Sequence, residues 1–97
     1  MAKDKQYYVY IITTTYNTVL YTGVTTDIDR RIEEHRTKAY QKSFSARYEV
    51  KKLVYFEAID DYESAMLREK QIKGWSRLKK RNLVTSRNPK WKDLYKM

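Results

Sequence analysis

Two tyrosines that a β-hairpin would bring together are the first residues that could do chemistry. The segments YYVYIIT (7–13) and VLYTG (19–23) are rich in aromatic and β-branched residues, and a polar stretch separates them, which predicts two antiparallel strands. If the connecting loop has two or four residues, Tyr10 pairs with Gly23, and Tyr10 and Tyr21 become diagonal neighbours on one face. Such phenols could take part in catalysis, although strand tyrosines also meet by chance in a chain with ten of them. The strand-end Gly23 is typical of a place where backbone approaches a ligand closely.

Arg31 and His35 would lie at the border between core and solvent on a predicted helix. At about 100° per residue, Ile28 and Ile32 form a buried stripe. Arg31 and His35 flank that stripe, whereas Arg30 points to the far side. A cleft residue should lie at such a border, and so should an ordinary boundary histidine with its hydrogen bonds satisfied.

Glu69 is the most unusual residue of a second predicted helix. With Tyr62 and Ala65 on its apolar face, Glu69 falls in the middle of that face. A buried carboxylate is costly unless it is paired or coordinates a cation. Two interpretations remain open, which are a salt bridge to Arg31, Lys73 or another base, and a hard-metal ligand of the kind that holds Mg²⁺.

The elements that would position these residues are legible along the chain. Thr26 with Asp29, and Asp60 with Glu63, have the spacing of capping boxes, and Gly74 can end the second helix. We expect strands at 7–13 and 19–23, a helix from about 26 to 35, a strand at 52–58, and helices at 62–73 and about 76–84. This order, ββαβαα, predicts an α+β fold in which helices flank a small three-stranded, mainly antiparallel sheet.

The positive charge is concentrated in the last thirty residues. Up to Leu67 there are ten Lys/Arg against ten Asp/Glu, whereas from Arg68 onward there are eleven against two. A basic segment of this kind favours nucleic acid as the partner and lacks the broad apolar face of a membrane-surface helix. The residues expected to contact phosphates are Lys73, Arg77, Lys79, Lys80 and Arg81.

Taken together, these residues resemble the GIY-YIG endonuclease domain over essentially the whole chain. The resemblance rests on YVY (8–10), YTG (21–23), an arginine eight residues past the glycine and a histidine four beyond it. The downstream segments REKQIKGW (68–75) and NPKWKDL (88–94) are similar to the family's small stand-alone bacterial branch of uncharacterised nuclease-like proteins.

The resemblance implies roles for individual residues. By motif position, Tyr10 and Tyr21 match the family's two motif tyrosines, and Gly23 matches its closing glycine. Arg31 matches the catalytic arginine, His35 its histidine partner and Glu69 the metal-binding glutamate. Two positions depart from the pattern, since Tyr8 replaces the first motif's glycine and Thr22 the second motif's central aliphatic residue. For the family's late asparagine, Asn88 is the candidate, with Asn82 as the alternative.

The implied reaction is phosphodiester hydrolysis assisted by one divalent metal, Mg²⁺ or Mn²⁺. Glu69 would hold the metal, Arg31 would neutralise the phosphate, and a tyrosine would deprotonate water. Tyr10 is favoured as that base, with Tyr21 orienting water, and the choice between them stays open. The phenol's pKa of about 10 would have to fall, which Arg31, His35 and the metal could each promote. All five side chains are expected to line one cleft on one face of the sheet.

Length and composition set the remaining expectations. A chain of 97 residues without cysteine, signal-type segment or long apolar run predicts one domain over residues 1–97 in the cytoplasm. A metal-dependent endonuclease acting on nucleic acid is favoured, with DNA as substrate and a role in repair or recombination by analogy with the family. The alternative is a nucleic-acid-binding module whose catalysis has lapsed. The sequence leaves the substrate's structure and the oligomeric state open.

Overall fold

The computed structural model describes residues 6–37 and 50–95. Its elements are β1 (Tyr7–Thr13), β2 (Leu20–Thr25), α1 (Ile28–Thr37), β3 (Lys52–Ile59), α3 (Tyr62–Lys73) and α4 (Arg77–Arg87). This order confirms the predicted ββαβαα arrangement and the α+β class. None of the helices described is long and apolar enough to cross a membrane.

The three strands form an antiparallel sheet in the order β2-β1-β3. Tyr10 is the partner of Gly23 and Ile12 of Tyr21, which is the predicted register. The loop between the strands is longer than expected, since Thr13 pairs with Leu20. A loop lengthened by an even number of residues keeps the same pairs opposite each other, so the register survives.

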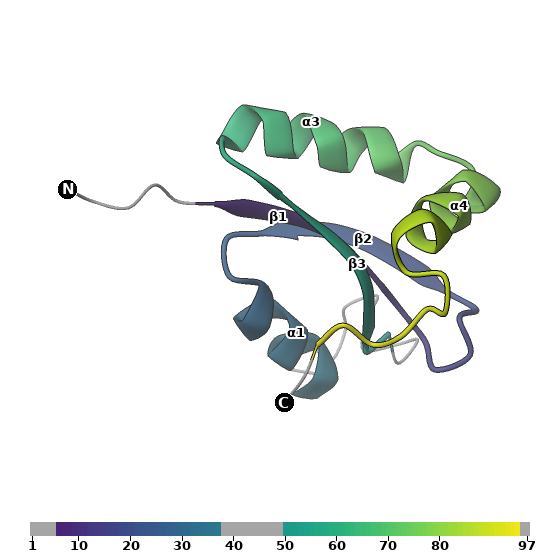
Figure 1. Ribbon diagram of the computed structural model, residues 1–97. Coiled ribbons are helices and arrows are strands. Elements are labelled where there is room, and N and C mark those ends of the chain that lie inside the picture. The colour runs from purple at the N-terminus through teal and green to yellow at the C-terminus, as the bar shows by residue number, and fades with distance from the viewer. Residues whose placement is uncertain (1–5, 38–49, 96–97) are drawn as a thin grey trace.

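Helices cover both faces of the sheet (Figure 1), with α1 on one side and α3 and α4 on the other. Alternation along β1 divides the core accordingly. Val9 and Ile11 pack with residues of α3 and α4, whereas Tyr10 and Ile12 pack with Ile32 of α1. Side chains from α1 and α3 can therefore meet only around an edge of the sheet, and β2 is the edge strand beside β1.

Both capping predictions were wrong by one residue. The α1 cap is Asp27, whose carboxylate accepts the Arg30 N–H, and the α3 cap is Asp61, which accepts from Ser64. Aspartate in these positions supplies a charged acceptor at a helix N-terminus, where the dipole favours negative charge. The last helix begins after its cap Ser76, close to the predicted start, and it is longer than predicted because it continues to Arg87.

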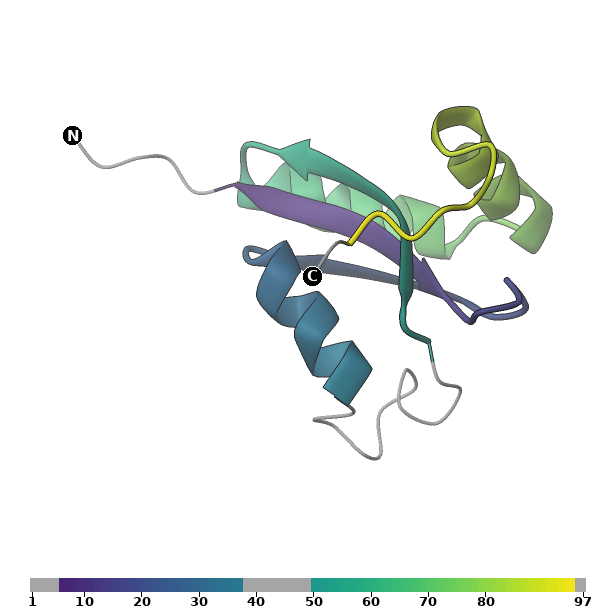
Figure 2. The same cartoon turned by 60° about the horizontal axis from the view of Figure 1, so that its bottom comes forward.

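The segment after α4 returns along β3 to the α1 side of the sheet (Figure 2). The Leu94 N–H donates to the Leu53 carbonyl, and Asp93 accepts from the Leu53 N–H. Asp93 also pairs with Arg36 at the end of α1. The C-terminal segment thus ties β3 to α1, at the sheet edge opposite β2.

Candidate active site

Three aromatic rings meet on the α1 face of the sheet. The Tyr10 hydroxyl lies 3.2 Å from His35 Nε2, and both residues are buried. The Tyr21 ring centroid is 5.5 Å from that of His35 and 6.5 Å from that of Tyr10. Strand pairing positions the two tyrosines and the third turn of α1 brings His35 over them, so the predicted constellation is assembled from three elements.

Gly23 gives the Tyr10 ring its place. A Cβ atom on Gly23 would lie 2.5 Å from the Tyr10 hydroxyl oxygen, closer than such contacts occur. Because Gly23 belongs to the edge strand, the Tyr10 ring lies across β2 and its hydroxyl points toward the sheet edge. The close approach predicted at this glycine is therefore made by a side chain of the protein itself.

The environment keeps both hydrogen-bonded groups neutral at pH 7. Burial raises the pKa of Tyr10 well above its usual range, with Tyr21 adding to the rise and Arg31 opposing it. Burial first, and then the Arg31 charge, lower the pKa of His35 to about 4, while the Glu34 charge opposes them. A neutral His35 gives Tyr10 no positive charge to stabilise a phenolate, so of these two side chains Arg31 is the one that lowers the pKa of Tyr10, as the sequence interpretation expected.

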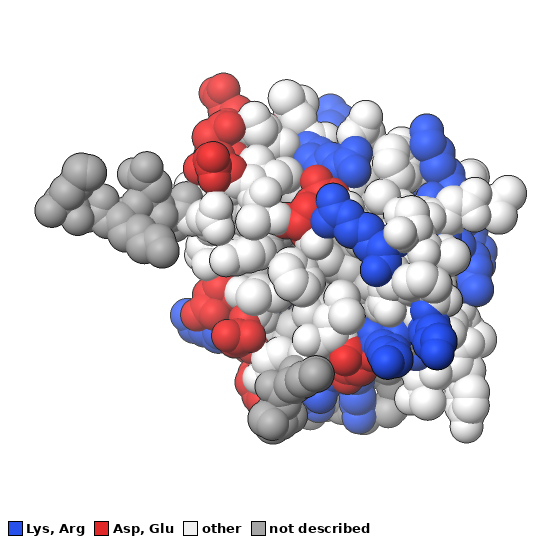
Figure 3. All heavy atoms as spheres, in the orientation of Figure 1, with Lys and Arg blue, Asp and Glu red and all other residues white. Residues whose placement is uncertain are grey.

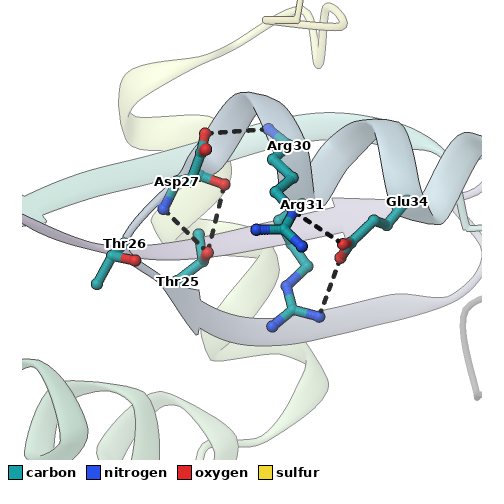
Figure 4. A pocket seen from close by; sticks show the side chains of 6 residues that line it. All are labelled: Thr25, Thr26, Asp27, Arg30, Arg31 and Glu34. Carbon is teal, nitrogen blue, oxygen red and sulfur yellow. Dashed lines mark hydrogen bonds and ion pairs between the residues drawn. The ribbon is translucent and has the colours of Figure 1, made fainter.

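Arg31 leaves α1 at the β2 edge, beside a pocket at the start of the helix (Figure 4). Its guanidinium pairs with Glu34 at 3.5 Å, and Arg30 pairs with the same carboxylate at 3.3 Å. Arg30 points away from the buried stripe of α1, as predicted, and its side chain is 77 % exposed. Its long side chain bends back to Glu34 one turn later, a spacing at which opposite charges attract. Sequence reasoning missed Glu34, although its i+3 and i+4 relation to the two arginines was the available signal.

Glu69 comes from the opposite face of the sheet, so the five residues do not share one face as expected. Its side chain is 14 % exposed, and its carboxylate lies 2.8 Å from Lys73 Nζ, one of the partners considered from the sequence. The charge of Glu69 nevertheless contributes to the raised pKa of Tyr10, as does that of Glu34. Glu69 therefore acts electrostatically on the same hydroxyl as Arg31, from the other side of β2.

Asn88 lies elsewhere in the fold. Its amide nitrogen donates to the carbonyls of Val54 and Lys92, and its amide oxygen accepts from the Lys92 N–H. Val54 belongs to β3, which is separated from β2 by the central strand. The structure therefore does not bring this candidate into the cluster, and Asn82 is exposed on α4.

The cations of α4 are engaged with the protein to different extents. Arg77 donates to the Thr18 carbonyl and Arg81 to that of Asn17, which anchors α4 to the hairpin loop. Lys79 lies over the Trp75 ring at 4.5 Å from its centroid. Figure 3 shows Lys and Arg side chains gathered over α4 and the segment after it, away from the acidic starts of α1 and α3. Of the other two residues predicted to contact phosphates, Lys80 also lies on α4, and Lys73 is paired with Glu69.

Comparisons with known proteins show the family of this chain. The model of the GIY-YIG catalytic domain matches residues 6–82. A UPF0213 protein of Haloquadratum walsbyi is 42 % identical over 78 residues, covering 80 % of this chain and 85 % of that protein. A UPF0213 protein of Natronomonas pharaonis is 43 % identical over 84 residues, covering 87 % and 94 %.

A solved structure of a relative supports the fold as well. The solution NMR structure of a UPF0213 protein from Bacillus halodurans is 35 % identical, with a TM-score of 0.57, and the match covers 95 % of this chain and 96 % of that one. The matched range includes the motif residues from Tyr8 to Glu69, whereas the segment NPKWKDL (88–94) lies beyond it. The chain therefore belongs to the GIY-YIG catalytic domain family.

Proposed function

We propose that this protein is a metal-dependent endonuclease that hydrolyses phosphodiester bonds in DNA, with Mg²⁺ or Mn²⁺ as cofactor. One observation carries the proposal. The Tyr10 hydroxyl is hydrogen-bonded to His35, while Arg31 and Glu69 act on it electrostatically from the two sides of the β2 edge. The Tyr10 phenol and the His35 imidazole meet in one hydrogen bond, and the charges of Arg31 and Glu69 both shift the pKa of that phenol. Perturbed pKa values gather at functional sites.

Arg31 would bind the scissile phosphate. Its side chain is 37 % exposed, so its guanidinium can reach a ligand while remaining close enough to Tyr10 and His35 to lower their pKa values. The planar fork of donors suits two phosphate oxygens at once, and its charge opposes the negative charge that grows during the reaction.

Tyr10 and His35 would move the proton of the attacking water. Because Tyr10 is a neutral phenol, it takes the water proton on its oxygen while passing its own proton to His35 Nε2. This transfer needs His35 as the tautomer protonated at Nδ1, which leaves Nε2 as the acceptor. The second phenol, Tyr21, packs against both rings and would orient the water.

The residues present fit a single hard cation held by Glu69. Among residues 6–37 and 50–95 there is no group of three or more His, Cys, Asp or Glu that could form an all-protein cage. Mg²⁺ does not require such a cage, because it keeps several waters and binds through one or two carboxylates and substrate phosphates. The bound metal would act as a Lewis acid on the phosphate oxygens. Lys73, whose side chain is 51 % exposed, would have to release Glu69.

The substitution Glu69→Gln tests the proposal. It keeps the size of the side chain and removes its charge, so Mg²⁺-dependent cleavage of DNA should fall by about a hundredfold or more. The Glu69–Lys73 pair is an i,i+4 pair with one exposed partner, so the loss in stability should stay within about 1 kcal/mol. Cleavage rate and thermal unfolding are measured on the same preparation.

Lys73→Gln is the matched control, because it breaks the same ion pair and leaves the carboxylate in place. It should lower cleavage by no more than about tenfold, the effect of one lost phosphate contact. If Glu69→Gln cleaves at the parental rate, or if the two variants lose cleavage equally, Glu69 is not the metal ligand. If wild-type protein binds DNA but cleaves none with any metal, the lapsed binding module is the better description.

A further inference from the structure

A pocket of about 250 Å³ lies beside the Tyr10–His35 cluster at the start of α1 (Figure 4). The residues lining it are Thr25, Thr26, Asp27, Arg30, Arg31 and Glu34. Only Arg31 of this set carries a role in the proposed hydrolysis. The Asp27 carboxylate caps α1, and the Thr25 hydroxyl accepts from the Asp27 N–H. Arg30 pairs with Glu34 and has no role in the proposed reaction.

The two arginines converge although they are neighbours in the helix. Consecutive helical residues diverge by about 100°, so their side chains do not normally face one another. Here both guanidiniums reach Glu34, from which they lie 3.3 and 3.5 Å away, and Figure 4 shows the two contacts to its carboxylate as dashed lines. Glu34 therefore gathers two forks of donors into one pocket.

The ion pairs that hold this arrangement are weak enough to exchange. Charge-assisted N–H···O contacts of full strength measure about 2.7 to 2.9 Å, shorter than either pair. The Arg30 side chain is 77 % exposed and that of Arg31 37 %, and pairs of this kind contribute little to stability. A phosphodiester also carries one negative charge on two acceptor oxygens that suit a guanidinium fork, so it can replace the Glu34 carboxylate.

The arginines would serve two different phosphates. Arg31 is the one whose charge reaches the Tyr10–His35 pair, whereas Arg30 lies further out toward solvent. Resting on the proposed function, we propose that this pocket is a subsite for a second phosphate of the same nucleic-acid strand, next to the phosphate on Arg31. Arg30 contacts that second phosphate, and Glu34 is the counter-ion that the strand displaces. The subsite fixes the path of the strand across the β2 edge.

Dinucleotides separate this subsite from the rest of the basic surface, because they are too short to reach α4 as well. The probes are dTpdT, with one phosphate, and pdTpdT and dTpdTp, with two, titrated in the presence of a chelator so that no cleavage occurs. The wild type should bind one of the two-phosphate probes at least about fivefold more tightly than dTpdT. The Nε–H resonances of Arg30 and Arg31 should shift together along the titration.

Arg30→Gln should bind dTpdT as the wild type does and lose the preference for the second phosphate. The matched control is Lys90→Gln, which removes one positive charge from an exposed residue beyond α4 and should keep the preference. The proposal is overturned if Arg30→Gln keeps the preference, if Lys90→Gln loses it as well, or if the Arg30 resonance does not move. It is also overturned if inorganic phosphate at equal concentration shifts Arg30 as strongly, since the pocket would then bind any anion.

This experiment fails independently of the nuclease proposal, because binding is measured without metal. A protein that prefers two phosphates but never cleaves DNA keeps the subsite and loses the proposed reaction. A protein that cleaves DNA in a Glu69-dependent way, with no preference for the second phosphate, keeps the reaction and loses the subsite.

Discussion

Two regions of this molecule bury polar side chains, and they do so in opposite ways. Beyond α4, Asn88 makes three hydrogen bonds to backbone groups, and Trp91 donates its indole N–H to Thr85. At the β2 edge, the buried Tyr10 and His35 bind each other, and both are titratable groups. The first region satisfies backbone that would otherwise lack partners, whereas the second holds groups whose protons can move.

The kind of hydrogen-bond partner distinguishes a structural side chain from a candidate catalytic one better than the degree of burial does. Asn88 and His35 are almost equally buried, at 6 % and 8 % exposed. An amide bonded to carbonyls has no second protonation state near pH 7, so its contribution is to stability. The Tyr10 phenol and the His35 imidazole are hydrogen-bonded, each has a pKa far from its usual value, and in the proposed reaction they transfer a proton. We therefore expect substitutions in the first region to affect folding, and substitutions in the second to affect cleavage.

Asn88→Ala should have the largest effect on stability. It leaves the Val54 and Lys92 carbonyls and the Lys92 N–H without this partner. At about 1 kcal/mol for each hydrogen bond, the free energy of unfolding should fall by about 2 to 4 kcal/mol, as measured by chemical denaturation. Asn88→Asp keeps the acceptor but cannot donate to the Val54 carbonyl, so it should be destabilised as well. Full stability of both variants would remove Asn88 from its structural role.

His35 should produce a smaller, pH-dependent effect. Its pKa is about 4 in the folded protein and about 6.5 when exposed, so the unfolded chain binds more protons between these values. Stability is then complete above about pH 6.5 and is lost as the pH falls toward 4, by on the order of 2 kcal/mol between pH 7 and pH 5. His35→Gln should flatten this dependence in denaturation curves at pH 7, 6 and 5. An identical pH dependence in the variant would mean that His35 is not held neutral by burial.

Much of the site was predictable, because strand pairing depends on a simple count. Tyr10 and Gly23 stay opposite each other when the hairpin loop grows by one residue on each side. The observed six-residue loop therefore did not disturb the prediction. The side-chain alternation along β1 then placed Tyr10 and Tyr21 together. Family resemblance supplied the roles, which the geometry alone does not carry.

The part of the site that was predicted wrongly depended on helical phase. Tyr62 was taken as core but is 58 % exposed, and the buried residues of α3 are Ala65 and Ile72. This shift moves Glu69 from the centre of the buried face to its border, about 50° away. The position of a helix on one sheet face or the other is a tertiary choice, so periodicity could not predict that α1 and α3 cover opposite faces and that Glu69 and Arg31 both affect the pKa of Tyr10.

Single-turnover cleavage of DNA by the wild type, Tyr10→Phe and Asn88→Ala tests the central claim most directly. The assay uses single-stranded, duplex and branched DNA with Mg²⁺, Mn²⁺ or chelator, at a temperature where all three proteins are folded. The account predicts metal-dependent cleavage by the wild type and Asn88→Ala, and a loss of about a hundredfold or more in Tyr10→Phe. Tyr10→Phe removes only the hydroxyl that binds His35. Parental cleavage by Tyr10→Phe, or equal losses in the two variants, would contradict the assignment of chemistry to the β2 edge.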